Sequence, residues 1–384
     1  MEKYDAVIVG AGLAGLQCAR LLGRDGLRVL LVDRKPAVDS SIHTTGIFVR
    51  RTLEDFDLPE DCLGAAINNV TLYSPARRSM TLHSDLPEFR IGRMGPLYQR
   101  FLGQCLNAGV EWSPDTSYMG SEPVADGSRV HLEAKKKSRY VDTRFLIGAD
   151  GANSRVARDL HLDLNREWIV GVEDVLADVA LNGPPQLHCF LDPALAPGYL
   201  AWVAHDGVET HVGVGGYSEK FSPVIALENF RSSLEPLFRL RNATRIERRG
   251  GRIPVGGVLR RIVNDRGLLI GDAAGAVSPL TAGGLDPCMR LSTLAADLIV
   301  QYCRSGDLQL FRSYSGESFR ARFASRIWMR RIIANLTNRP LLEFGCALIR
   351  APVLNAFAWH IFFGRGSFPD VSAAHRRGEL PVAT

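Results

Sequence analysis

The stretch AVIVGAGLAGLQCARLLGRDGLRVLLVDR, residues 6–34, decides the fold of the first part of the chain. Its apolar run at residues 6–9 predicts a buried parallel strand, because such strands are covered on both faces. Leucines at helical spacing follow, Gly26 is placed to end that helix, and residues 28–32 predict a second buried strand. The stretch is therefore a βαβ unit whose first turn is rich in glycine.

The glycine-rich turn GAGLAG, residues 10–15, follows the pattern G-x-G-x-x-G. Gly10 permits a tight turn, Gly12 lets the backbone approach a pyrophosphate, and Gly15 allows the helix to pack closely on the strand. The amino end of the helix offers N–H groups and a partial positive charge to phosphates. Asp33 ends the second strand 18 residues after Gly15, where a carboxylate can accept both hydroxyls of an adenosine ribose. Glycine turns are common, but strand, helix and acid in register predict a dinucleotide site.

A second glycine-rich segment, GDAAG at residues 271–275, decides which dinucleotide is expected. It follows an apolar strand, and Gly284 and Leu285 then open another helix. The Asp272 carboxylate can hold a polyol chain, and the two amides at the helix N-terminus can stabilise negative charge on a reduced flavin. The alternative is an aspartate helix cap beside a loop without function.

The middle of the chain changes to a pattern of strands. Residues 168–216 are rich in β-forming runs, and His205-Asp206-Gly207 between two of them is a strong hairpin signal. Parallel-sheet elements precede and follow this region, which predicts an antiparallel sheet inserted in a nucleotide-binding domain. After Leu285 the sequence is mostly helical.

Three blocks in this order carry a resemblance to known flavoproteins: residues 10–15, GADG at residues 148–151, and residues 271–285. Over residues 3–305 the chain resembles proteins of the para-hydroxybenzoate hydroxylase fold, and among them the geranylgeranyl reductase family, which hydrogenates prenyl chains of lipids and pigments. The resemblance implies an α/β fold with a doubly wound, Rossmann-like FAD-binding domain, an inserted antiparallel β-sheet substrate domain and a helical C-terminal region. The predicted limits are 1–72, 95–165 and 253–305 for the FAD-binding domain, 73–94 and 166–252 for the substrate domain, and 306–384 for the C-terminal region.

The resemblance also implies which residues line the FAD. Besides the three glycines of the first turn they are Ala14, Asp33, Arg34, Thr44, Thr45, Gly46, Arg100, Asp150, Asp272, Gly284 and Leu285. Asp150 would face the pyrophosphate and the path of a nicotinamide donor. Arg100 opens a helix, where its charge suits a ribose or phosphate contact, and a solvated helix arginine is the alternative.

Departures from the family pattern leave the catalytic residue unnamed. Prenyl reductases usually carry a cysteine beside the flavin, in a turn where this chain has His43-Thr44-Thr45-Gly46 and no cysteine. The sequence GYLAWVAHD at residues 198–206 keeps the family's tryptophan but loses its Phe-Pro-Lys. The Trp-x-Trp-x-Ile-Pro pattern of flavin halogenases is absent. His43 is a candidate proton donor or a loop histidine bonded to backbone, and Trp202 is a candidate cavity wall or a core residue. For Cys288 we expect an inert packed thiol.

Composition limits the function classes. The 384 residues are 46% hydrophobic and 23% charged, which is typical of a folded globular protein. A net charge of +5 is too small and dispersed to indicate nucleic-acid binding. The seven cysteines show no metal-ligand spacing, so we expect no metal site and a reducing, cytoplasmic location. A core strand begins near Tyr4, so no signal peptide is expected before it.

The C-terminal region combines basic and apolar residues. Eight arginines and two acids lie between residues 312 and 350, and residues 341–363 are apolar but interrupted by Arg350 and Pro352. A transmembrane span tolerates few charges, so these interruptions argue against one. One interpretation is a region that rests peripherally on anionic lipid and admits a long hydrophobic substrate. The other is a set of helices packed over the substrate domain with a solvated arginine face.

These observations favour an FAD-dependent oxidoreductase that reduces C=C bonds of a long apolar, isoprenoid-like substrate. The expected electron donor is NAD(P)H. It would bind in a transient groove, because no second G-x-G-x-x-G follows a strand, and an electron-carrier protein stays open as the reductant. One alternative is a flavin monooxygenase acting on an aromatic or polyketide substrate. Another is a flavin-bearing lipid-binding protein without turnover.

Overall fold

The computed structural model describes residues 1–179, 183–235, 237–240 and 242–364. Within them, a first sheet has a parallel part in the order β7-β2-β1-β10-β16 and an antiparallel extension, β10-β9-β8. Its strands are β1 (Glu2–Val9), β2 (Val29–Val32), β7 (Glu111–Ser113), β8 (Thr116–Val124), β9 (Gly127–Ala134), β10 (Lys137–Gly148) and β16 (Gly267–Leu269). The βαβ unit predicted for residues 6–34 is confirmed, although β1 begins earlier, at Glu2.

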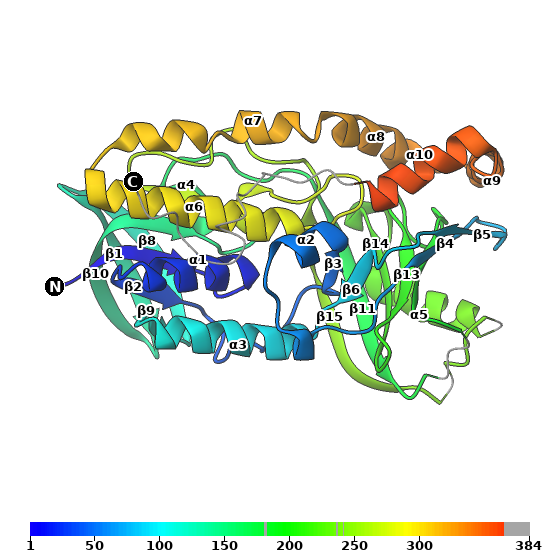
Figure 1. The fold of residues 1–384 in the computed structure, drawn as a ribbon, viewed down its shortest axis with the longest axis horizontal. Coiled ribbons are helices and arrows are strands. Elements are labelled where there is room, and N and C mark those ends of the chain that lie inside the picture. The colour runs from blue at the N-terminus through cyan, green and yellow to red at the C-terminus, as the bar shows by residue number, and fades with distance from the viewer. Residues whose placement is uncertain (180–182, 236, 241, 365–384) are drawn as a thin grey trace.

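Three helices cover the parallel strands. They are α1 (Leu13–Arg24), α3 (Met94–Asn107) and α6 (Leu285–Ser305), and α1 packs between the other two (Figure 1). Gly26 has φ +80° just after α1, as expected for the residue that ends it. Leu16 and Leu22 of α1 are fully buried, so α1 is fixed on the parallel strands with its amino end at the carboxyl edge of the sheet.

A second sheet has the order β15-β11-β14-β13-β12-β4-β5 within the described residues. Its strands are β4 (Asn69–Tyr73), β5 (Ser79–His83), β11 (Trp168–Ala177), β12 (Gln186–Phe190), β13 (Ala201–His205), β14 (Thr210–Gly216) and β15 (Thr244–Pro254). The hairpin predicted at Asp206-Gly207 is confirmed by the antiparallel pairing of β13 with β14. The sheet is antiparallel as expected, except that β12 runs parallel to β4. Since β4 begins at Asn69, this sheet includes residues 69–72, and the domain limits themselves stay a prediction.

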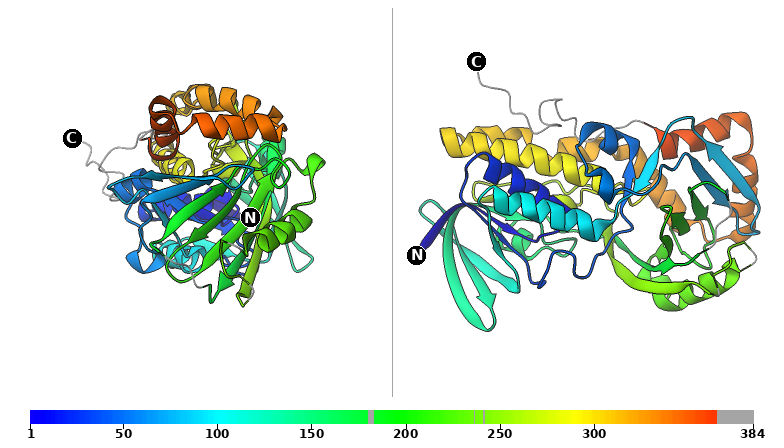
Figure 2. Two further views of the ribbon diagram at one scale, coloured as in Figure 1. Left: turned by 90° about the vertical axis from the view of Figure 1, so that its right-hand side faces the viewer. Right: turned by 60° about the horizontal axis from the view of Figure 1, so that its bottom comes forward.

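The substrate sheet has its own apolar core. Helix α5 (Pro223–Leu234) packs on β11 and β14, and Phe230 and Leu234 are buried there beside Val212 and Val214. Figure 2 shows this second unit beside the first, with long strands running across it. Shorter elements complete the fold: β3 (Ile47–Val49), β6 (Phe89–Ile91), α2 (Arg50–Asp55), α4 (Arg155–Asp159) and short 3₁₀ helices at Glu60–Cys62, Ser218–Lys220, Gly271–Ala274 and Leu308–Ser313.

The C-terminal region is helical as predicted, with α7 (Gly316–Ala321), α8 (Ala324–Asn335), α9 (Arg339–Leu348) and α10 (Pro352–Phe363). These helices run from above α6 to the edge of the substrate sheet (Figure 1). None of the helices in the described part of the chain has, by itself, the length and hydropathy of a membrane-spanning helix. Helices α9 and α10 meet that test only as a pair, bent by 100°.

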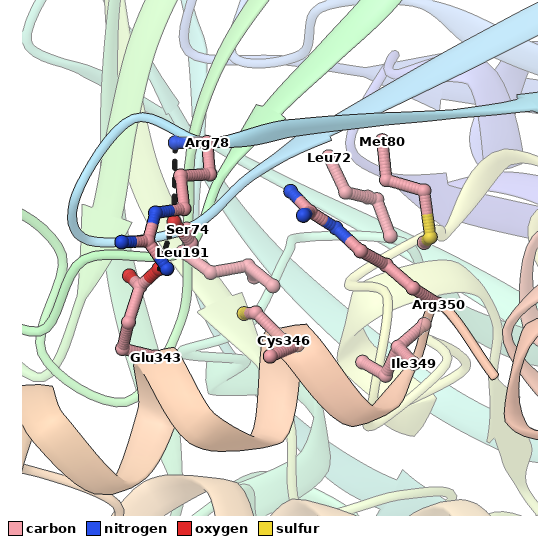
Figure 3. A pocket seen from close by; sticks show the side chains of 10 residues that line it. Leu72, Ser74, Arg78, Met80, Leu191, Glu343, Cys346, Ile349 and Arg350 are labelled. Carbon is pink, nitrogen blue, oxygen red and sulfur yellow. Dashed lines mark hydrogen bonds and ion pairs between the residues drawn. The ribbon is translucent and has the colours of Figure 1, made fainter.

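Hydrogen bonds hold helix α9 on the edge of the substrate sheet. Glu343 accepts hydrogen bonds from the Ser74 hydroxyl and the Ala76 amide, both at 3.0 Å. Arg350 donates to the Ser79 carbonyl at 3.3 Å. Figure 3 shows Glu343 of α9, and Arg350 just after the end of that helix, reaching toward β4 and β5. The interpretation of helices packed over the substrate sheet is therefore confirmed for α9.

Candidate active site

The glycine turn after β1 leaves room for a ligand on one side only. A Cβ atom at Gly10, which has φ +106°, would lie 2.2 Å from the Ala149 carbonyl oxygen, and one at Gly15 would lie 1.8 Å from the Gly10 oxygen. Both glycines are therefore required by contacts inside the protein. A Cβ atom at Gly12 would meet no atom within 4 Å. That open side, at the amino end of α1, fits the pyrophosphate of a dinucleotide.

Asp33 braces this turn at the end of β2. One oxygen of its carboxylate accepts a hydrogen bond from the Ala11 amide at 2.7 Å, and the other accepts one from the Lys35 amide at 2.9 Å. A carboxylate has about four acceptor positions, so two remain for the hydroxyls of an adenosine ribose. Bracing of the turn is a second role that the sequence pattern did not indicate.

Asp272 follows β16 and lines the cavity that begins at the glycine turn. Among the described residues, no group donates a hydrogen bond to its carboxylate, and burial raises the pKa of Asp272 to about 6. A desolvated acceptor facing a cavity is suited to the hydroxyls of a polyol chain. Gly284 and Leu285 begin α6 without a side-chain cap, so the positive end of that helix dipole also faces the cavity.

We expect the flavin-free protein to bind FAD more tightly as the pH rises from about 5 to about 7. The Asp272 carboxyl is neutral below a pKa of about 6 and ionised above it, and hydrogen bonds from hydroxyls favour the ionised form. Quenching of flavin fluorescence gives the dissociation constant at each pH. Asp272→Asn should weaken binding at neutral pH and flatten the dependence. Equal pH dependence in both proteins would remove this role from the carboxylate.

The cavity measures about 1090 Å³ and is lined by the glycine turn, the substrate sheet and the C-terminal helices. The structure brings together on its wall most of the residues predicted to contact FAD: Gly10, Gly12, Ala14, Asp33, Arg34, Thr44, Thr45, Gly46, Asp150, Asp272, Gly284 and Leu285. Gly15 lies behind them, in the contact between α1 and β1. The contacts with FAD themselves stay predictions.

Two predicted residues differ from expectation in position or use. Arg100 does not line the cavity: its half-exposed guanidinium lies 2.6 Å from Asp61, so the alternative of a solvated helix arginine describes it better. The Asp150 carboxylate is turned toward α4, where it accepts hydrogen bonds from the Ser154 hydroxyl at 2.6 Å and the Arg155 amide at 2.7 Å. Asp150 therefore lines the cavity while its carboxylate caps a helix.

A buried charged cluster joins the loop at residues 43–46 to the substrate sheet. The Thr45 hydroxyl donates to Glu173 at 2.6 Å, and the Trp202 indole N–H donates to the same carboxylate at 3.3 Å. Arg249 donates to the Thr44 carbonyl at 3.1 Å and lies 3.7 Å from Glu173. Strands β11 and β15 thus bind the loop at residues 43–46, and Trp202 of β13 joins the same cluster.

His211 completes the cluster from β14. Its Nδ1 lies 3.6 Å from Glu173, and both side chains are almost fully buried. Burial by itself would raise the pKa of Glu173, but His211, Thr45 and Arg249 outweigh it and hold the pKa below its usual value. Glu173 is therefore an ionised carboxylate on the cavity wall. Sequence analysis missed Glu173, Arg249 and His211, although an acid inside the apolar run of β11 was a visible signal.

The three residues with alternative interpretations are now placed. His43 lines the cavity and its Nδ1 lies 2.8 Å from the Gly250 carbonyl oxygen, so it is a loop histidine bonded to backbone that also faces the site. Trp202 lines the cavity, and a Cβ atom at Gly213 would lie 2.2 Å from its ring, so the ring lies flat on β14. Burial raises the pKa of the Cys288 thiol, as expected for an inert packed cysteine.

Comparison with known proteins agrees with this geometry. The family model described as FAD binding domain matches residues 3–330. Digeranylgeranylglycerophospholipid reductase of Methanocaldococcus jannaschii is 26% identical over 312 residues, which cover 80% of this chain and 79% of that protein. Digeranylgeranylglycerophospholipid reductase 1 of Methanopyrus kandleri is 27% identical over 361 residues, which cover 89% and 94%.

Solved structures agree on the fold. A geranylgeranyl bacteriochlorophyll reductase-like protein from Thermoplasma acidophilum has a TM-score of 0.82 at 18% identity, over 98% of this chain and 95% of that one. p-Nitrophenol 4-monooxygenase from Pseudomonas putida has a TM-score of 0.72 at 17% identity, over 95% and 100%. The predicted fold class and the FAD cofactor are confirmed. The chain belongs to the FAD-binding domain family and is an FAD-dependent oxidoreductase similar to the geranylgeranyl reductases.

Proposed function

We propose that this oxidoreductase reduces C=C bonds of a long apolar, isoprenoid-like substrate with electrons from NAD(P)H. The observation that carries the proposal is the composition of the cavity wall. Its far end is apolar and is formed by strands of the substrate sheet together with the C-terminal helices, as in Leu187, Leu200, Ile333, Ile349 and Phe362. A chain-like substrate gains about 0.8 kcal/mol for each CH₂ group removed from water, so such a wall can bind it with few polar contacts.

The chain's own residues orient the substrate and exclude water. Bound FAD supplies the hydride chemistry. The Tyr199 hydroxyl donates to the Thr281 carbonyl at 2.7 Å, which ties the substrate sheet to the segment that precedes α6. Glu173 fixes Thr45 and Trp202 on the opposite wall. The relatives that are named as reductases of digeranylgeranylglycerophospholipids support a reductase and an apolar lipid-like substrate.

Anaerobic turnover tests the proposal. The protein loaded with FAD and reduced under nitrogen should be reoxidised by a geranylgeranyl lipid without oxygen, with one saturated bond formed for each flavin reoxidised. A monooxygenase would instead need oxygen and would consume it when a substrate triggers NAD(P)H oxidation. A lipid-binding protein would bind the lipid and leave the flavin reduced. Either of these two results contradicts the reductase.

We propose a cytoplasmic, membrane-peripheral location, and the outer surface of the C-terminal helices supports the membrane contact. Large apolar side chains are exposed on α8, α9 and α10, among them Trp328 at 64%, Phe344 at 62% and Val353 at 80%. The arginines of this region add positive charge, each worth about 1 kcal/mol near an anionic membrane. We propose that this face rests on anionic lipid and that a substrate enters the cavity beside α10, whose Phe362 lines it.

Replacing exposed apolar residues by glutamate should release the protein from liposomes. Phe344→Glu combined with Val353→Glu should lower binding to anionic vesicles at least tenfold, because each lost side chain removes about 1.5–3 kcal/mol of burial. Ile225→Glu, at an equally exposed position on α5, should leave binding unchanged. Co-sedimentation at low and high salt measures both effects, and salt should weaken wild-type binding. Wild-type protein that stays in the supernatant at low salt would contradict the membrane contact.

A further inference from the structure

Two arginines one helical turn apart on α8, Arg326 and Arg330, lie on the cavity wall. Arg330 is only 3% exposed, and its guanidinium lies 5.6 Å and 5.1 Å from the ring centres of Tyr199 and Tyr217. Its Nε donates to the Tyr217 hydroxyl at 3.3 Å, but Nη1 and Nη2 are buried without a hydrogen-bond partner. Two donor groups of a buried cation are thus left unused.

Arg326 is partly satisfied by a neutral group. Its Nη1 donates to the Ser278 hydroxyl at 3.0 Å, and burial lowers its pKa. Asp286 is the acid that acts on it electrostatically, but that carboxylate is already bonded to Arg290 and Thr52, each at 2.9 Å. Across the described part of the chain, no carboxylate forms an ion pair with either Arg326 or Arg330.

The other buried arginines of the described residues all have a carboxylate partner, so the lack of one at Arg330 is exceptional. Arg50, Arg249 and Arg290 are also buried, and each forms an ion pair with a buried or half-buried carboxylate. A buried charge is costly to leave unpaired, and contact with two tyrosine faces offsets only part of that cost. Among the buried arginines of the described residues, Arg330 is the one that lacks an acid and lines the cavity. The missing partner is therefore expected to be an anion brought by a ligand.

We propose that Arg330 and Arg326 bind the phosphate or diphosphate group of an apolar-tailed substrate. Guanidinium groups bind phosphate oxygens in paired hydrogen bonds, and the Ser278 hydroxyl beside Arg326 offers one more donor. The phosphates of FAD are expected at a different position, the amino end of α1, which packs on the sheet that contains β1. The tail would follow Ile333, which continues the same helix along the cavity, toward Ile349 and Phe362. The assignment of the tail rests on the proposed function.

Calorimetric titration of the FAD-loaded protein tests this assignment with three probes: geranylgeranyl phosphate, geranylgeraniol and inorganic diphosphate. The phosphate ester should bind at least tenfold more tightly than the alcohol, because charge-assisted hydrogen bonds are strong in a buried site. Arg330→Gln and Arg326→Gln should each lower that ratio about tenfold, with little change in the affinity for the alcohol. Arg331→Gln is the matched control, because Arg331 is an exposed arginine on the same helix.

The outcomes separate the site from the proposed function. A phosphate preference that survives in both Arg330→Gln and Arg326→Gln, with each variant folded by its melting temperature, overturns the site. If neither prenyl probe binds or is reduced, the proposed function is wrong. Titration with inorganic diphosphate then tests whether Arg330 and Arg326 still form an anion-binding site. Diphosphate binding that is lost in Arg330→Gln but kept in Arg331→Gln upholds an anion site for a free phosphate. If, in that case, the wild type does not bind diphosphate either, the anion-binding site is also wrong.

Discussion

Replacing Gly15 with alanine should give a protein that is less stable and retains no FAD, whereas replacing Gly12 with alanine should abolish FAD binding alone. A Cβ atom at Gly15 would lie 1.8 Å from the Gly10 carbonyl oxygen, so α1 would have to move away from β1. Overpacking of this kind costs about 3 kcal/mol. A Cβ atom at Gly12 meets no protein atom within 4 Å and occupies space that the pyrophosphate needs.

The two variants are controls for each other. The ratio of flavin to protein absorbance after gel filtration measures FAD retention, and urea unfolding of the flavin-free proteins measures stability. A Gly12→Ala protein that stays yellow would show that the backbone at Gly12 need not approach the phosphates. A Gly15→Ala protein as stable as the wild type would show that α1 has room to shift.

The features that sequence predicts well are those whose causes are local. The glycine turn, the strand before it and the helix after it are adjacent in the chain, and the hairpin at Asp206-Gly207 follows from the turn chemistry of two residues. Asp33 and Asp272 were identified because each follows a short apolar strand that had to end at the same edge of a parallel sheet.

The features that sequence missed arise from pairing between distant segments. Thr45 and Glu173 are 128 residues apart and meet only because the substrate sheet packs on the loop at residues 43–46. Arg249 comes from a third segment, β15, which pairs with β11. Arg100 lies off the cavity wall for a related reason: helical spacing does not say which face of α3 is exposed to solvent, and in the structure Leu97 and Phe101 occupy the buried face.

Glu173→Gln should lower both stability and the rate of flavin reoxidation by substrate. The buried carboxylate accepts a hydrogen bond from Thr45 at 2.6 Å and lies 3.6 Å from His211 and 3.7 Å from Arg249. The variant therefore removes one of the two acids beside the buried Arg249 and leaves it paired with Glu247 alone. A buried cation left with no acid costs about 3 kcal/mol or more, and the loss here should be smaller because Glu247 remains beside Arg249. Hydrogen bonds to a charged group are worth about 1.5–3 kcal/mol, so we expect reoxidation to slow about 10- to 100-fold.

Asp174→Asn is the matched control, because Asp174 is the next residue on β11 and points to the opposite face. It is also buried and paired with arginines, Arg248 at 2.7 Å and Arg231 at 2.8 Å, but it does not line the cavity. This variant should lose stability and keep the reoxidation rate, so equal rates in both variants would make Glu173 purely structural.

The pH dependence of stability gives a second test of the role of Glu173. The pKa of Glu173 lies below the ordinary value of a glutamate carboxyl, so its stabilisation is present above that ordinary value and is lost as the pH falls through the folded pKa. The difference in unfolding free energy between wild type and Glu173→Gln should therefore shrink on acidification, and a difference that grows would contradict an ionised Glu173.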